Sequence, residues 1–153
     1  MANILLCHDE ANFAYTRAAI WKEVYGHIVS VCTSAAESLS RARRGLSDID
    51  IALFHKDLGL GRERYGAGDV IRVVQEESPW IRVGVISGEF PDGEQTVVRE
   101  YQADFYLPTV TNYDDPWLLQ QLNSGYVNEE NRRQRGRRVE MPPHASSREK
   151  RWF

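Results

Sequence analysis

The sequence lacks several features that would assign it to a well-marked class of protein. It has two cysteines, Cys7 and Cys32, in 153 residues, which are too few for the disulfide framework of a small secreted domain. Both lie in apolar runs, which favours reduced, buried thiols over a redox pair. No apolar stretch approaches the roughly 20 residues of a membrane helix, and residues 1–3 lead into a predicted strand rather than a secretion signal. We therefore expect a cytoplasmic protein without membrane contact.

The composition indicates one domain and a tail. A hydrophobic fraction of 42%, with 10% aromatic residues, is enough for one core. The net charge is −3, yet residues 127–153 hold eight Lys or Arg against four Asp or Glu, so the body is acidic and the tail is basic. We predict a domain over residues 1–126 and a tail over residues 127–153 that either extends the last helix or is disordered.

Short apolar runs alternate with helical patterns along the body. The predicted strands are Asn3–Cys7, Ile28–Cys32, Ile51–Phe54, Ile81–Ile86 and Phe105–Leu107. Each is followed by a helical segment, and the helix starts and stops are marked at Gly26, Ser34, Ser78, Pro91 and Asp114 or Asp115. Five strands alternating with five helices predict an α/β fold with a doubly wound, five-stranded parallel sheet.

In two of the predicted helices the spacing of the apolar residues indicates which face packs inward. In the first, the inward residues are predicted to be Phe13, Ile20, Trp21 and Val24. In the second, Ser34 and Glu37 have capping-box spacing, and the face is predicted to consist of Ala35, Leu39, Ala42 and Leu46.

Two other segments invite a phosphate-binding interpretation. The loop over residues 58–68 is rich in Gly and Arg, but its glycines do not fit the spacing of a Walker loop. We expect a flexible loop with solvated arginines. The basic tail carries no recognised DNA-binding motif, so we do not expect nucleic-acid binding.

Polar residues follow the predicted strands. His8 and Asp9 come after the first strand, His55 and Asp57 after the third, and Ser87 after the fourth. In open α/β sheets the residues past the carboxyl ends of the strands line the ligand crevice. These residues therefore mark the predicted functional site.

The order of the predicted elements and the residues at their ends resemble those of the receiver domain of two-component response regulators over about residues 2–125. The matching stretches are LLCHDE, DIALFHKDLGLG, VGVISG and ADFYLPTV. In that family an acidic pair follows strand one, an acceptor Asp ends strand three, Ser or Thr ends strand four, and Lys-Pro follows strand five. The resemblance implies the flavodoxin-like (βα)5 receiver fold.

The residues at the family's phosphorylation site differ in this sequence. His8 stands where the first acidic residue is usual, and Asp9 keeps the second. His55 takes the acceptor position, and Asp57 falls two residues later. Ser87 matches the hydroxyl residue of the family.

The fifth strand carries further matches and one loss. Tyr106 corresponds to the switch aromatic, whereas Thr109 and Val110 replace Lys-Pro. The resemblance implies a surface formed by strand five with helices four and five that serves dimers and outputs, and our candidates there are Tyr101, Tyr106 and Trp117.

Phosphoryl transfer to a carboxylate depends on Mg²⁺, which prefers oxygen ligands. Imidazoles in place of the acceptor and of one metal-binding carboxylate remove the nucleophile and two such ligands. We predict a pseudo-receiver: a non-catalytic signalling module that needs no cofactor. The alternative is an atypical response regulator that a histidine kinase phosphorylates on Asp57, with Asp9 and Asp57 binding Mg²⁺.

His8, His55 and Asp9 also allow a transition-metal site, because imidazole suits zinc or nickel. Two histidines far apart in the sequence lack the short spacing of metal motifs, which favours imidazoles that fill a degenerate pocket. Whether the imidazoles sense pH stays open.

We expect the chain to act on a protein partner, which is a histidine kinase or an output protein. It is also a candidate for a homodimer through strand five and helices four and five. Because no output domain follows residue 126, any downstream effect is expected to go through another chain.

Overall fold

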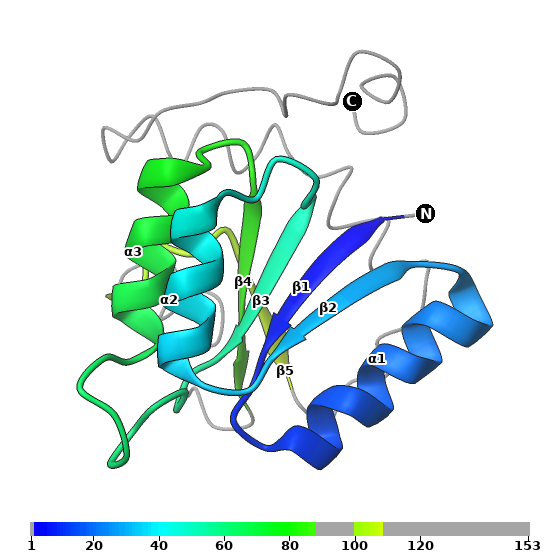
Figure 1. The fold of residues 1–153 in the computed structure, drawn as a ribbon, viewed down its shortest axis with the longest axis horizontal. Coiled ribbons are helices and arrows are strands. Elements are labelled where there is room, and N and C mark those ends of the chain that lie inside the picture. Colours follow the sequence, from blue (N-terminus) through cyan, green and yellow to red (C-terminus); the bar gives the residue numbers. More distant parts are fainter. Residues whose placement is uncertain (1, 88–99, 109–153) are drawn as a thin grey trace.

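The computed structural model describes residues 2–87 and 100–108, and its centre is a five-stranded parallel sheet (Figure 1). The strand order is β2-β1-β3-β4-β5, which is the flavodoxin-like order. The strands are β1 (Asn3–Cys7), β2 (Ile28–Cys32), β3 (Ile51–His55), β4 (Arg82–Ser87) and β5 (Phe105–Pro108). The predicted doubly wound α/β fold is confirmed.

Three helices connect the strands within the described residues. They are α1 (Ala11–Tyr25), α2 (Ala35–Arg44) and α3 (Ala67–Glu77). The predicted helices at Pro91 and at Asp114 or Asp115 lie outside the described residues, as do Thr109, Trp117 and the tail over residues 127–153. Among the described helices, none combines the length and the apolar character needed to cross a membrane.

Helix α1 ends at Gly26, as predicted, because the chain turns there with φ of 74°, a conformation that suits glycine. Its predicted inward face is partly wrong. Trp21 is buried against the sheet, but Ile20 and Val24 are 39% and 66% exposed. The helix is apolar on both sides, so apolar spacing alone did not distinguish its inner face from its outer one.

Helix α2 begins at the predicted cap, where the Ser34 hydroxyl accepts a hydrogen bond from the Glu37 backbone N–H at 3.0 Å. The prediction that Leu46 lies on its apolar face is wrong. The helix ends at Arg44, with Gly45 at its C-cap. Leu46 is nevertheless fully buried, because the chain after Gly45 stays against the core.

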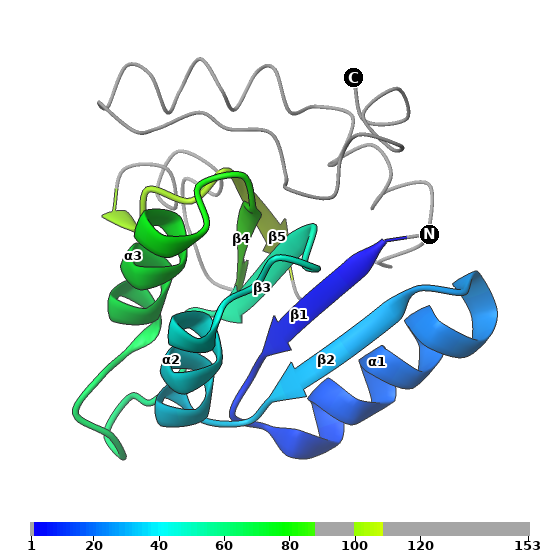
Figure 2. The same cartoon turned by 45° about the horizontal axis from the view of Figure 1, so that its top comes forward.

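Two apolar layers cover the two faces of the sheet. The larger layer packs α2 and α3 on one face, and α1 packs on the other face (Figure 2). β3 is buried from Ile51 to Phe54, as expected of a central parallel strand.

The loop between β3 and α3 is tied to α2. The Glu63 carboxylate accepts hydrogen bonds from the backbone N–H groups of Ala35 and Ala36 at 2.7 and 2.9 Å. Gly59 makes the turn with φ of 78°, and a Cβ there would collide with the Tyr65 carbonyl. The two arginines expected to be solvated, Arg62 and Arg64, are exposed, whereas Glu63 between them caps the neighbouring helix.

Two buried aspartates join strands at the amino edge of the sheet. Asp50 and Asn3 exchange hydrogen bonds: the Asp50 carboxylate accepts from the Asn3 backbone N–H, and the Asp50 N–H donates to the Asn3 carbonyl, both at 2.8 Å. Asp104 and Val83 repeat this arrangement at 2.8 and 2.7 Å. Each aspartate therefore fixes where the neighbouring strand begins.

The fifth strand packs closely on the fourth because Gly84 has no side chain. The Phe105 ring occupies the place where a Cβ at position 84 would be. Gly84 and Phe105 are partners in the strand register.

Cys7 and Cys32 are free and buried, as predicted. They lie opposite each other in the register of β1 and β2. Burial raises the pKa of the Cys7 thiol well above its ordinary value, and the hydrogen bond from Cys7 lowers the pKa of Cys32.

Candidate functional site

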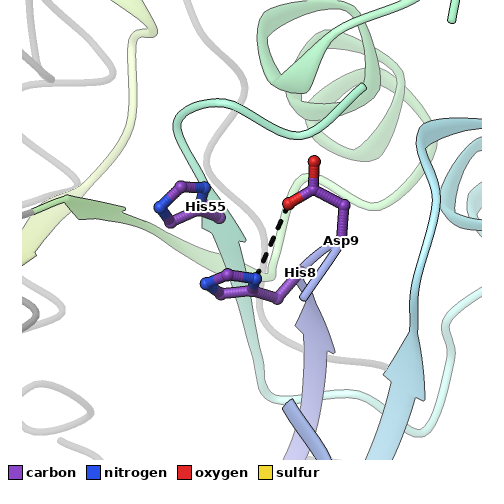
Figure 3. Close-up of side chains that lie close together, drawn as sticks. All are labelled: His8, Asp9 and His55. Carbon is purple, nitrogen blue, oxygen red and sulfur yellow. Dashed lines mark ion pairs between the residues drawn. The ribbon is translucent and has the colours of Figure 1, made fainter. Parts of the chain in front are cut away.

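The predicted site lies at the carboxyl edge of the sheet, where β1 and β3 end side by side. Cys7 pairs with Phe54 in the strand register, so the next residues, His8 and His55, leave the sheet as neighbours. His55 is the last residue of β3, one position inside the strand relative to the prediction. Its ring faces His8 rather than turning away (Figure 3).

The two imidazoles stack on each other. Their ring centroids are 4.2 Å apart, with an angle of 30° between the planes. The other neighbour of His8 is Phe13 from α1, whose ring centroid lies 4.6 Å away. His8 is thus held by rings from two different elements and is 3% exposed.

Each imidazole accepts a hydrogen bond from the backbone two residues later. His8 Nδ1 accepts from the Glu10 N–H at 3.0 Å, and His55 Nδ1 accepts from the Asp57 N–H at 3.3 Å. In a neutral ring the proton then resides on Nε2.

The burial of His8 sets its charge. Burial and the neighbouring His55 lower its pKa from 6.5 to about 4, although Asp9 acts in the opposite direction. Asp9 Oδ1 lies 3.7 Å from His8 Nδ1, which is the contact dashed in Figure 3. Because the pKa of His8 is so low, this contact joins a neutral ring to a carboxylate near neutral pH.

His8, Asp9 and His55 come together as the sequence predicts. One ligand atom from each of the three lies within 4.8 Å of the others. Within the described residues, Asp57 is not part of this cluster. Burial, followed by the carboxylates of Glu100 and Asp57, raises the pKa of Tyr101, so Asp57 is close enough to Tyr101 to influence it.

Ser87 and Tyr106 meet at the ends of β4 and β5. Ser87 is fully buried, and its carbonyl accepts a hydrogen bond from the Tyr106 hydroxyl at 2.6 Å. Tyr106 and Tyr101 are partly buried and pack against the larger apolar layer.

One contact of this site was not predicted from the sequence. Phe13 was assigned to the inner face of α1, yet its ring packs on His8. Its position five residues after a strand-end histidine was the available signal, since the first turn of a helix after a strand lies beside the crevice.

Comparison with solved structures places this arrangement among known folds. The structure is similar to a response regulator receiver domain protein from Clostridium thermocellum, with 17% identity, a TM-score of 0.60, and coverage of 89% of this chain and 98% of that one. This is the receiver fold. A CheY-like receiver domain protein from Methanospirillum hungatei JF-1 is similar over 88% of this chain and 98% of that one, with 16% identity and a TM-score of 0.62.

A third similar structure contains a phosphorylated residue. It is a response regulator from Burkholderia pseudomallei with a phosphorylated aspartic acid and a calcium ion, at 23% identity and a TM-score of 0.64, with coverage of 88% of this chain and 75% of that one. No family model matches the sequence. No curated protein matches it either.

Proposed function

We propose that this chain is a receiver-type signalling module that acts by protein–protein interaction, without catalysis and without phosphorylation. The observation that carries the proposal is the imidazole of His55, which ends β3 and stacks on His8 at 4.2 Å between ring centroids. A receiver needs a carboxylate there as the nucleophile. In this chain the position is occupied by the imidazole of His55, so the nucleophilic carboxylate is missing.

The donor set also does not fit magnesium. Mg²⁺ demands oxygen ligands in near-octahedral geometry, and the cluster of His8, Asp9 and His55 offers one carboxylate beside two imidazoles. We therefore assign no step to Mg²⁺ in the function of this chain.

A second candidate function is phosphorylation of Asp57 by a histidine kinase. It is favoured by the position of Asp57, which is partly buried and two residues beyond the end of β3. The Asp57 backbone N–H donates a hydrogen bond to His55. In this candidate function the kinase would therefore phosphorylate a carboxylate that lies beside the imidazole pair, not at the position that His55 occupies.

Intact-mass spectrometry after treatment with acetyl phosphate and Mg²⁺ separates the two functions. We expect the mass of the full chain to stay unchanged, because the reactive carboxylate is missing. A stable, stoichiometric adduct on any aspartate would contradict the proposal. Loss of such an adduct in Asp57→Asn would identify Asp57 as the phosphate acceptor, as the second function requires.

The chain offers its own gain-of-function control. The double variant His8→Asp/His55→Asp restores carboxylates at both imidazole positions. We expect this variant to take up phosphate under the same conditions. That result would show that the reagent and the fold were competent and that the imidazoles block the reaction.

The partner surface of the proposed module includes β5. Its support is the hydrogen bond from the Tyr106 hydroxyl to the Ser87 carbonyl, which links an aromatic residue at the sheet edge to the rim of the site. A partner that changes the Tyr106 rotamer would break this bond and would thereby couple binding at β5 to the conformation of the site. The partner is a signalling protein, either a histidine kinase or an output protein, or a second copy of this chain.

A further inference from the structure

The sheet brings together two histidines that the sequence separates. Because Cys7 and Phe54 are register partners on adjacent parallel strands, His8 and His55 emerge next to each other whatever the length of chain between them. Short ligand spacing, whose absence argued against a metal site in the sequence, is therefore unnecessary. Asp9 adds a carboxylate from the residue after His8 (Figure 3).

The distances suit one metal ion. His8 Nδ1 and Asp9 Oδ1 are 3.7 Å apart, and one ligand atom from each of the three residues lies within 4.8 Å of the other two. Bonds of about 2.0–2.2 Å place two tetrahedral ligands of zinc roughly 3.3–3.6 Å from each other. Shifts of an ångström or so would bring all three groups onto a shared ion.

The two rings must move by different amounts. They are nearly parallel, at 30°, and ring nitrogens aim their lone pairs within the ring plane, so the lone pairs do not yet converge. His8 is held by Phe13 and by burial, whereas His55 is partly exposed. Rotation of the His55 side chain is the adjustment that the surroundings permit.

The same movement releases a weak hydrogen bond. His55 Nδ1 accepts from the Asp57 N–H at 3.3 Å, at the long end of such bonds. His8 Nδ1 accepts from the Glu10 N–H at 3.0 Å, so a metal on this atom would replace a backbone donor near the rim of the sheet. Both exchanges trade a neutral hydrogen bond for a metal–ligand bond.

We propose that His8, Asp9 and His55 bind a divalent transition-metal ion, with zinc or nickel as the fitting class and water completing the coordination. Imidazole binds these ions well, whereas magnesium selects carboxylate and water. Three protein ligands with two of them partly exposed leave an open coordination position toward solvent. The carboxyl edge of the sheet would then respond to metal binding rather than to phosphorylation.

The test is a competition titration of the full chain against a chromogenic chelator, after removal of bound metal. We expect one zinc ion per chain at micromolar metal and no binding of Mg²⁺ at millimolar concentration. Cobalt(II) bound in place of zinc should give visible d–d bands without a sulfur charge-transfer band, because Cys7 and Cys32 are not ligands.

Matched variants locate the ion. Asparagine at position 55 retains an acceptor for the Asp57 N–H but is a poor zinc ligand. We expect His55→Asn and Asp9→Asn to weaken zinc binding by about 100-fold, since loss of a supporting partner alone costs 10–100-fold. His144→Asn, in the tail, should bind zinc as the unaltered chain does. Thermal melts in chelator would show that the variants remain folded.

Three results would overturn the proposal: no zinc binding at micromolar metal, equal affinity in folded His55→Asn and the unaltered chain, or a sulfur charge-transfer band with cobalt. The proposal stands apart from the proposed function. A phosphate adduct on aspartate would remove the latter and leave the zinc titration as it is.

Discussion

His8 is a residue whose charge depends on its surroundings. Its ring is 3% exposed, it lies between Phe13 and His55, and its pKa falls to about 4. An imidazole with this pKa carries no charge at neutral pH. The folded chain therefore resists protonation of His8, and the unfolded chain does not.

This difference predicts how the stability of the metal-free protein depends on pH. The unfolded chain takes up a proton on residue 8 below pH 6.5, whereas the folded chain does so near pH 4. The free energy of unfolding should thus decrease as the pH falls through this window, by up to about 3 kcal/mol at roughly 1.4 kcal/mol per pKa unit. Urea unfolding in chelator between pH 7 and pH 4 measures it.

Asparagine at position 8 isolates the contribution of the ring. Its side-chain oxygen can accept from the Glu10 N–H, as His8 Nδ1 does, but it does not titrate. In His8→Asn the free energy of unfolding should decrease less as the pH falls. In His144→Asn it should decrease as it does in the unaltered chain. An unchanged slope in His8→Asn would assign the pH dependence to other groups.

Helix α2 shows how an element can depend on a distant residue. The N-cap residue Ser34 caps its first turn. Glu63, from the loop between β3 and α3, caps the same turn, because its two carboxylate oxygens accept hydrogen bonds from the N–H groups of Ala35 and Ala36. A carboxylate at this end also interacts favourably with the helix dipole. The loop that carries Glu63 and the start of α2 therefore form one unit.

Removal of this cap should destabilise the protein. Glu63→Ala leaves two backbone donors without the carboxylate, and we expect the free energy of unfolding to decrease by about 1–2 kcal/mol, as for the loss of other helix caps. Urea unfolding followed by circular dichroism measures the change. The control variant Glu76→Ala, at an exposed position on α3, should change the free energy of unfolding by less than about 0.5 kcal/mol. A similar decrease in both variants would mean that Glu63 stabilises the protein only through its charge.

Elements with a local signal were predictable from the sequence. β1 and β2 have the predicted bounds, and Gly26 ends α1 where expected. The cap from Glu63 was not predictable, because its partners lie in α2 and only the fold brings them together. The exposed side of α1 was missed for a different reason: Ile20 and Val24 are apolar, and apolar residues do not report whether anything covers them.

At the scale of the whole molecule, the two edges of the sheet have different chemistry. The amino edge is closed by buried carboxylates, Asp50 and Asp104, which are bound to neighbouring strands. The carboxyl edge carries the partly exposed cluster of His8, Asp9 and His55. Stability and the proposed binding functions are thus located at opposite ends of the strands.

A change at the amino edge should therefore affect stability alone. Asp104→Ala leaves the Val83 N–H without its carboxylate partner, and we expect the free energy of unfolding to decrease by about 2 kcal/mol, in the range for hydrogen bonds to charged groups. Zinc affinity should be unchanged. Asp48→Ala, with a side chain 69% exposed, is the matched control and should have little effect on unfolding in urea.

The location of the candidate site was predictable because parallel strands end at one edge, and that rule placed His8, Asp9 and His55 together. The stacking of the two rings and the backbone donors on both Nδ1 atoms were not predictable. They depend on side-chain torsions and on how the chain turns after each strand, which residue types alone do not determine.

The absence of a side chain at position 84 makes two distant positions interdependent. The Phe105 ring occupies the space that any larger residue at Gly84 would need. Enlarging one residue is therefore compatible with the sheet only if the other becomes smaller. In an evolving lineage the pair would change jointly or remain as it is, which ties the sequence of β5 to that of β4.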